Sequence, residues 1–171
     1  MRPGRHLVLV VVGYMLTVLQ ASLQALVPVR VRVPELGLLV ALYAGLTARG
    51  GVAGASAVAF ALGYVTDLLA GAPKGLHALV FVLMCLLAKG ASLRLLLRGS
   101  LVSAGFAFAA SLSAAGLIVL TRAQTESGTL APLQMAPLQA AVTALAAPIV
   151  YGLLGRLEGR VAKAHAPGLG R

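Results

Sequence analysis

Six apolar runs divide this chain of 171 residues and constrain its fold more than any other feature. They are Leu7–Val27, Leu36–Ala48, Val52–Leu69, Leu76–Leu87, Leu101–Leu120 and Leu133–Leu154. Four of the runs approach or exceed the roughly 18–20 residues that a helix needs to cross about 30 Å of hydrocarbon. Only 11% of the residues are charged, against roughly 25% in a typical soluble domain. The sequence therefore predicts an all-α integral membrane protein with one transmembrane domain over residues 1–171.

The two shorter runs allow more than one interpretation. Leu76–Leu87 can be extended past Lys89 and Arg94, because these long side chains can carry their charges to the membrane interface. Leu36–Ala48 begins directly after Pro34-Glu35 and is too short to cross comfortably. It is a short span, a re-entrant segment or a helix buried by its neighbours. We therefore expect six transmembrane helices, with five as the alternative.

The positions of Lys and Arg predict the orientation of the spans. For six spans with a cytoplasmic N-terminus (residues 1–6), ten of the 14 basic residues are cytoplasmic, as the positive-inside rule requires. The four outside are Arg30, Arg32, Lys74 and Arg122. Five spans with the N-terminus outside give the same count, but Arg2 and Arg5 before the first run favour the cytoplasmic start. Both arrangements place the basic tail, residues 155–171, in the cytoplasm.

In a membrane protein, the formal net charge of +10 is explained by the positions of the basic residues. The excess lies in the loops and tails between the apolar runs, where basic residues orient the chain and contact anionic lipid. A nucleic-acid partner is not expected. The loop from Pro28 to Pro34 alternates valine with arginine, which predicts an extended segment with one basic face.

Asp67 is the only acidic residue inside a long apolar run. A carboxylate at the centre of a membrane helix costs about 2.5–3.5 kcal/mol, so such a residue is a candidate for function. A row of small residues leads to it in steps of four, which is the spacing of a close helix crossing. The row is Gly51, Ala55, Ala59 and Gly63. We expect this row to contact a neighbouring helix and to turn Asp67 into the protein.

A tight turn follows Asp67, because Gly71, Pro73 and Gly75 end one helix and begin the next. The turn brings Lys74 back toward Asp67. Two structural interpretations of the acid are an ion pair with Lys74 and a cap for the next helix, and the functional interpretation is that it helps to bind a partner. The residues do not decide between them. His77, one turn into the next helix, is expected to make a polar contact between helices.

The chain offers little for catalysis. It contains none of the motifs HExxH, GxxxxGK[ST] or G-x-S-x-G, and an intramembrane aspartyl hydrolase would need a second acid at depth. His6, His77, His165 and Cys85 are far apart in the sequence and do not form a metal set. We therefore predict no catalytic, cofactor or metal site, and a protein that is not an enzyme.

One segment of the chain, Pro34–Leu79, resembles the rod shape-determining membrane protein family MreD. The resemblance rests on Pro34-Glu35-Leu36, Tyr43, Arg49-Gly50-Gly51-x-x-Gly54 and Gly63-x-x-x-Asp67-Leu-Leu-x-Gly71-x-Pro73-x-Gly75-x-His77-Ala78-Leu79. Glu35 stands where the family more often has Asp. The resemblance marks nine residues as a candidate partner-binding or structural motif. They are Pro34, Glu35, Gly63, Asp67, Gly71, Pro73, Lys74, Gly75 and His77.

The resemblance implies a scaffold without enzymatic activity in the inner membrane of a bacterium. The implied partners are the bitopic protein MreC, in direct contact, and through it the MreB filament and the peptidoglycan synthases of cell elongation. Which helices contact MreC does not follow from the sequence, nor does self-association or the binding of a small molecule or lipid.

The same family is similar to the substrate-binding subunits of energy-coupling-factor vitamin transporters, which implies a bundle of that type. It also gives an alternative function, a vitamin-binding subunit. Such a protein needs polar and aromatic groups in an outer pocket, whereas this chain has no Trp and only 5% aromatic residues. Ala21-x-x-x-Ala25 in the first run is a possible contact for a transporter partner.

Overall fold

Helices make up all of the regular secondary structure that the computed structural model describes, which covers residues 3–26, 33–48, 51–70, 74–94, 100–125 and 136–164. The helices are α1 (Pro3–Leu26), α2 (Leu36–Leu46), α3 (Val52–Ala70), α4 (Leu76–Arg94), α5 (Ser100–Thr125) and α7 (Ala136–Ala164). Each corresponds to one of the six predicted apolar runs, so the all-α prediction is confirmed. The helix that begins at Leu76 continues past Lys89, as the extension of the fourth run predicted.

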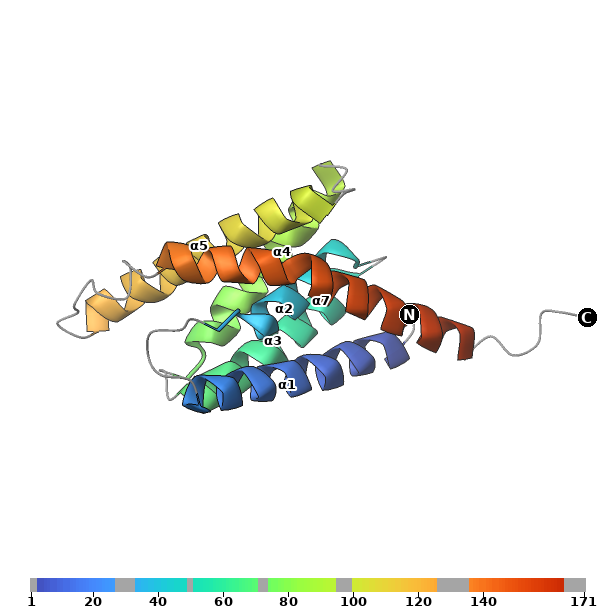
Figure 1. Cartoon of the computed structure of the whole chain (residues 1–171), viewed down its shortest axis with the longest axis horizontal. Coiled ribbons are helices and arrows are strands. Elements are labelled where there is room, and N and C mark those ends of the chain that lie inside the picture. The colour runs from blue at the N-terminus through green and yellow to red at the C-terminus, as the bar shows by residue number, and fades with distance from the viewer. Residues whose placement is uncertain are drawn as a thin grey trace, which may run out of the picture.

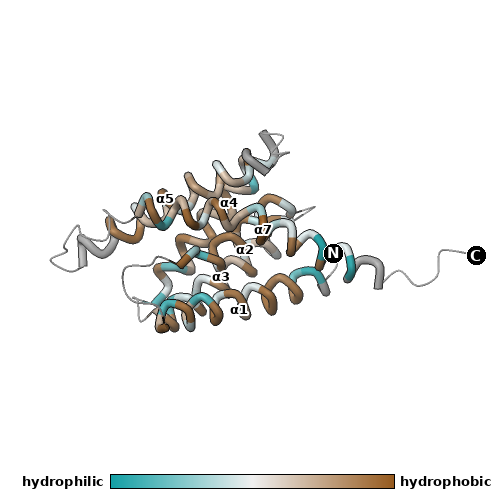
Figure 2. The backbone as a smooth tube through the Cα atoms, viewed as in Figure 1, coloured by the Kyte–Doolittle hydropathy of each residue, from teal (hydrophilic) through white to brown (hydrophobic). Residues whose placement is uncertain are grey.

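Four of these helices are long and apolar enough to span a membrane. The spans lie within α1 (Arg5–Leu26), α3 (Val52–Ala70), α5 (Val102–Leu120) and α7 (Ala136–Arg160), while α2 and the Leu76–Ser92 part of α4 are shorter apolar helices. Hydrophobic residues cover most of the helix lengths and hydrophilic ones lie mainly near helix ends (Figure 2). The chain is thus a multi-pass membrane protein.

α2 is the central helix of the bundle. It lies between α1 and α3 on one side and α5 and α7 on the other (Figure 1), and it contacts all four of them as well as α4. Every residue from Leu36 to Gly45 is buried, as expected for a helix that is apolar on all sides. Its 11 residues extend only about 16 Å. Of the three interpretations of this run, the helix buried by its neighbours describes the structure.

Two glycines allow helices to approach α4 closely. A Cβ atom at Gly45 of α2 would collide with the backbone oxygen of Cys85. A Cβ atom at Gly63 of α3 would lie 2.6 Å from the carbonyl oxygen of His77 and 2.7 Å from the amide nitrogen of Ala78. Since these neighbours are backbone atoms, the helices pack backbone to backbone at both crossings.

The small-residue row that leads to Asp67 lies on the buried side of α3, and its Gly63 contacts α4. Ala55, Ala59, Gly63 and Asp67 are all buried, and Gly51 is partly buried. The prediction that the row contacts other helices is therefore confirmed, and so is the prediction that Asp67 points into the protein. The extended segment predicted from Pro28 to Pro34 lies largely outside the described residues.

An ion pair brings the start of α1 and the last turns of α7 to the same end of the bundle. Arg5 Nε donates to Glu158 Oε1 at 2.8 Å, and a second guanidinium nitrogen of Arg5 donates to Thr47 Oγ1, just after α2. At the opposite end, the N–H of Leu36 donates to Gln20 Oε1 of α1 at 2.8 Å. α1 and α2 are therefore antiparallel, and both ends of the helical chain lie on one side, as an even number of crossings requires.

Candidate functional site

The Asp67 carboxylate caps the N-terminus of α4. Its Oδ1 accepts the N–H of His77 at 2.9 Å, and its Oδ2 accepts the N–H groups of Gly75 at 2.9 Å and Ala78 at 3.3 Å. The first N–H groups of a helix have no partner within it, and the helix dipole favours a negative charge at that end. The carboxylate side chain, which is 0% exposed, therefore satisfies donors that would otherwise be buried without partners.

Gly75 shapes the turn that brings these donors to the carboxylate. Its φ of 97° lies in the left-handed region that side chains with a Cβ rarely adopt. Its carbonyl oxygen accepts the N–H of Leu79 at 2.9 Å, which is the first hydrogen bond of α4. The glycine is thus required by backbone geometry. Gly71 and Pro73, the other two predicted turn residues, lie outside the described residues.

The partner of Asp67 in the turn is a histidine and not the neighbouring lysine. Lys74 is exposed, and the described residues include no ion pair between it and Asp67. His77 Nδ1 lies 2.7 Å from Asp67 Oδ1, so the predicted polar contact of His77 between helices is confirmed. The backbone N–H groups and the imidazole surround the carboxylate, and the capping interpretation of Asp67 is the one that the structure shows.

Glu35 forms a second polar cluster, at the start of α2. Its backbone N–H donates to Thr143 Oγ1 at 3.2 Å, and its carboxylate accepts from Gln139 Nε2 at 2.7 Å and from Ser111 Oγ at 3.3 Å. Pro34 closes the turn, because its carbonyl oxygen accepts the N–H of Leu36 at 3.0 Å. The cluster therefore attaches the start of the central helix to α5 and α7.

The polar partners of Glu35 and Leu36 were missed by the sequence reasoning. Gln20, Ser111, Gln139 and Thr143 are all uncharged polar residues within or next to apolar runs. Polar side chains at membrane depth are expected to bond across helices, so their presence was a usable signal. Their contacts with Glu35 and Leu36 were not predictable, because the four residues come from three helices, α1, α5 and α7, that are distant in the sequence.

The two clusters are points of attachment between helices. The carboxylates of Asp67 and Glu35 hold helix ends and neighbouring helices together through the hydrogen bonds just described. Among the described residues, no group of three His, Cys, Asp or Glu side chains lies close enough to hold a metal ion. This arrangement fixes α3 against α4 through Asp67, and α2 against α5 and α7 through Glu35.

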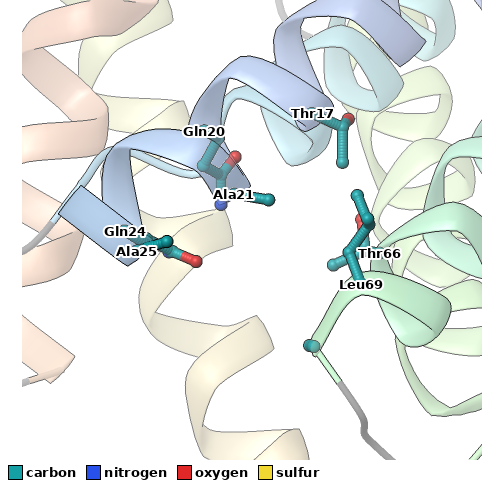
Figure 3. Close-up of a pocket in the computed structure, with 8 residues that line it drawn as sticks. Thr17, Gln20, Ala21, Gln24, Ala25, Thr66 and Leu69 are labelled. Carbon is teal, nitrogen blue, oxygen red and sulfur yellow. The ribbon is translucent and has the colours of Figure 1, made fainter.

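An open groove of about 250 Å³ lies between α1 and α3 (Figure 3). Its polar lining residues are Thr17, Gln20, Gln24 and Thr66, and small or apolar residues complete it. Gln20 also accepts the N–H of Leu36, so the groove borders the start of α2. Sequence reasoning did not predict this groove, although it did single out Ala21 and Ala25, which line it.

A comparison with known protein families identifies the family of this chain. The family model of the rod shape-determining protein MreD matches residues 2–157. The chain belongs to the MreD family. Neither the curated proteins nor the solved structures include a match to it. The matched residues extend from the start of α1 to within the last turns of α7, so the MreD resemblance covers far more than the segment Pro34–Leu79 that first indicated it.

Membership of the MreD family implies a role in the determination of rod shape. The matched region contains the Asp67 cap, the Glu35 cluster and the groove between α1 and α3. It ends directly before Glu158, the acid that pairs with Arg5. Apart from that ion pair, the polar contacts described above lie within the MreD part of the chain.

Proposed function

We propose that this MreD family member is a non-enzymatic scaffold of the inner-membrane complex for cell elongation. In this role it contacts MreC directly and, through MreC, helps to regulate the MreB filament and the peptidoglycan synthases. The observation that carries the proposal is the match of residues 2–157 to a rod shape-determining family. No cofactor is needed for such a function.

The geometry of the buried acids supports a scaffold. A catalytic acid or base must come within hydrogen-bonding reach of a substrate, whereas the Asp67 side chain is enclosed and accepts hydrogen bonds from the start of α4. Glu35 is likewise bonded to α5 and α7. These acids rigidify the bundle, which suits a protein that presents fixed surfaces to partners.

The vitamin-transporter alternative has no comparable support. Binding pockets for such ligands combine aromatic side chains with a few directed polar groups. The groove between α1 and α3 is lined by no aromatic residue. The expected similarity of the family to transporter subunits thus gives no reason to assign this chain a transported substrate.

Co-purification from native membranes tests the scaffold function. The protein is affinity-tagged and solubilised in mild detergent from membranes that contain MreC of the same organism at natural abundance. We expect it to recover MreC in near-stoichiometric amounts. A tagged, unrelated six-helix membrane protein at equal abundance is the control. Absence of MreC, together with an increase in melting temperature on addition of a vitamin, would contradict the scaffold and support the transporter function.

We further propose that both termini are cytoplasmic and that successive helices run in alternate directions through the membrane, with Lys74 in the periplasm. The contact of Arg5 with Glu158 supports an even number of crossings, and the positive-inside rule supports the direction. Arg156 and Arg160 are exposed on the last turns of α7, which extends beyond the other helices (Figure 1). This basic end is suited to contact anionic lipid of the cytoplasmic leaflet.

Cysteine labelling tests this orientation. In a Cys85→Ala background, an impermeant thiol reagent applied to intact spheroplasts is expected to label Lys74→Cys and to leave Arg160→Cys unlabelled until lysis. Both positions are exposed, so accessibility of the side chain does not limit the reaction. Labelling of Arg160→Cys before lysis would contradict the cytoplasmic tail.

A further inference from the structure

The groove between α1 and α3 lies between the last turns of two candidate membrane spans. Its α1 wall belongs to the span Arg5–Leu26 and its α3 wall to the span Val52–Ala70. It is near the end of the bundle where Asp67 caps α4, because Thr66 of the groove directly precedes Asp67. In the proposed orientation this is the periplasmic half of the membrane.

The side-chain amide of Gln20 is only partly satisfied within the chain. Gln20 is 9% exposed, and its Oε1 accepts the N–H of Leu36 at 2.8 Å. Its Nε2 donates to none of the described residues, and the residue lines the groove beside the exposed Gln24 (Figure 3). An amide N–H without a partner is costly in hydrocarbon, so a group that enters the groove is favoured if it brings an acceptor oxygen.

Small residues give the groove the shape of a seat for a helix. Thr17, Ala21 and Ala25 follow one another at intervals of four on α1, and Thr66 and Ala70 do the same on α3. The hydroxyl groups of Thr17 and Thr66 donate back to their own helices, to Gly13 O at 2.8 Å and Leu62 O at 2.9 Å. Thr17 is buried, with 3% of its surface exposed, and Thr66 is half-buried, so neither projects into the groove. Small residues at this spacing let a neighbouring helix approach closely.

We infer that this groove seats the transmembrane helix of a single-pass partner, whose contacting face carries small residues and an acceptor oxygen for Gln20 Nε2. Within hydrocarbon a polypeptide must be helical, because its backbone polar groups need internal partners. A lipid acyl chain could fill the space but would leave the amide of Gln20 unpaired. The identity of the partner rests on the proposed function, under which the bitopic helix is that of MreC.

Bulky substitutions in the groove test this inference. Ala21→Leu with Ala25→Leu fills the seat, whereas Ser22→Leu places the same side chain at the same depth on an exposed position outside it. Recovery of MreC is expected to fall about tenfold for the groove variant and to change less than about twofold for the control. Both variants should melt at the temperature of the unmodified protein, since none of the three positions is fully buried.

The outcomes separate the groove from the scaffold function. If the unmodified protein recovers no MreC, the proposed function is overturned together with the assignment of the partner. If the unmodified protein recovers MreC and the groove variant recovers just as much, the groove inference alone is overturned.

Photo-crosslinking identifies the occupant directly. A benzophenone amino acid at position 25 is expected to form an adduct with the membrane-spanning segment of MreC, located by peptide mapping, while the same probe at position 22 is not. Adducts at position 25 with lipid alone, or with a second copy of this chain alone, would overturn the inference.

Discussion

Replacing Gly63 with alanine is expected to lower the free energy of unfolding by about 1–3 kcal/mol, and replacing it with leucine to remove most of the folded protein. The added Cβ atom would lie 2.6 Å from the carbonyl oxygen of His77 and 2.7 Å from the amide nitrogen of Ala78. Because both neighbours are backbone atoms of α4, no side chain can rotate away. The two helices would have to separate where Asp67 caps α4, so recovery of MreC should fall as well.

Gly90 supplies the matched control for this change. A Cβ atom at Gly90 of α4 would meet nothing within 4 Å. Gly90→Ala should therefore cause no loss of stability and gain up to about 1 kcal/mol, because alanine favours the helix. Thermal unfolding in detergent, followed by circular dichroism, measures both variants. Equal melting temperatures for Gly63→Ala and Gly90→Ala would mean that α3 and α4 do not pack as closely as the structure shows.

The sequence predicted the helices well because hydrocarbon imposes a length and a composition on them. It could not determine the environment of the run at Leu36. Burial by other helices and exposure to lipid both select apolar side chains, so hydropathy alone does not separate a central helix from a short span. Only the positions of the surrounding helices showed that α2 is enclosed.

The candidate site was predictable in part for a similar reason. A single acid in an apolar run is conspicuous, so Asp67 was found, and the spacing of small residues correctly placed it at a helix contact. The sequence could not show whether Lys74 or the backbone of the next helix would reach the carboxylate, because this depends on the dihedral angles of the turn. The φ of Gly75 and the N–H groups of α4 decided it.

The Glu35 cluster shows why contacts between distant segments could not be predicted from the sequence. The residues that bond to it, Ser111, Gln139 and Thr143, are separated from it by 76, 104 and 108 positions. Each is an ordinary polar residue in its own segment, and no periodicity relates one segment to another. Such clusters depend on how the helices pack, which the sequence of one chain does not reveal.

Asp67→Asn is expected to lower the free energy of unfolding by about 2–4 kcal/mol. The asparagine retains one acceptor oxygen and turns an NH₂ group toward backbone N–H groups that the carboxylate had satisfied. His77→Ala removes one hydrogen bond to the Asp67 carboxylate and the edge contact of the imidazole with Phe81, and should cost about 1.5 kcal/mol. Lys74→Ala should have no measurable effect, because Lys74 is exposed and forms no ion pair with Asp67. Thermal unfolding in detergent ranks the three variants.

The same variants show whether the Asp67 cap is also needed for binding to MreC. Leu69 and Ala70, which line the groove proposed for the partner helix, lie within three residues of Asp67 at the end of α3. Loosening the cap should therefore displace one wall of the groove. We expect Asp67→Asn, assayed below its melting temperature, to remain inserted and abundant while it loses MreC recovery and rod shape. Lys74→Ala should retain both. Normal rod growth and normal MreC recovery for Asp67→Asn at unchanged abundance would restrict Asp67 to the stability of the bundle.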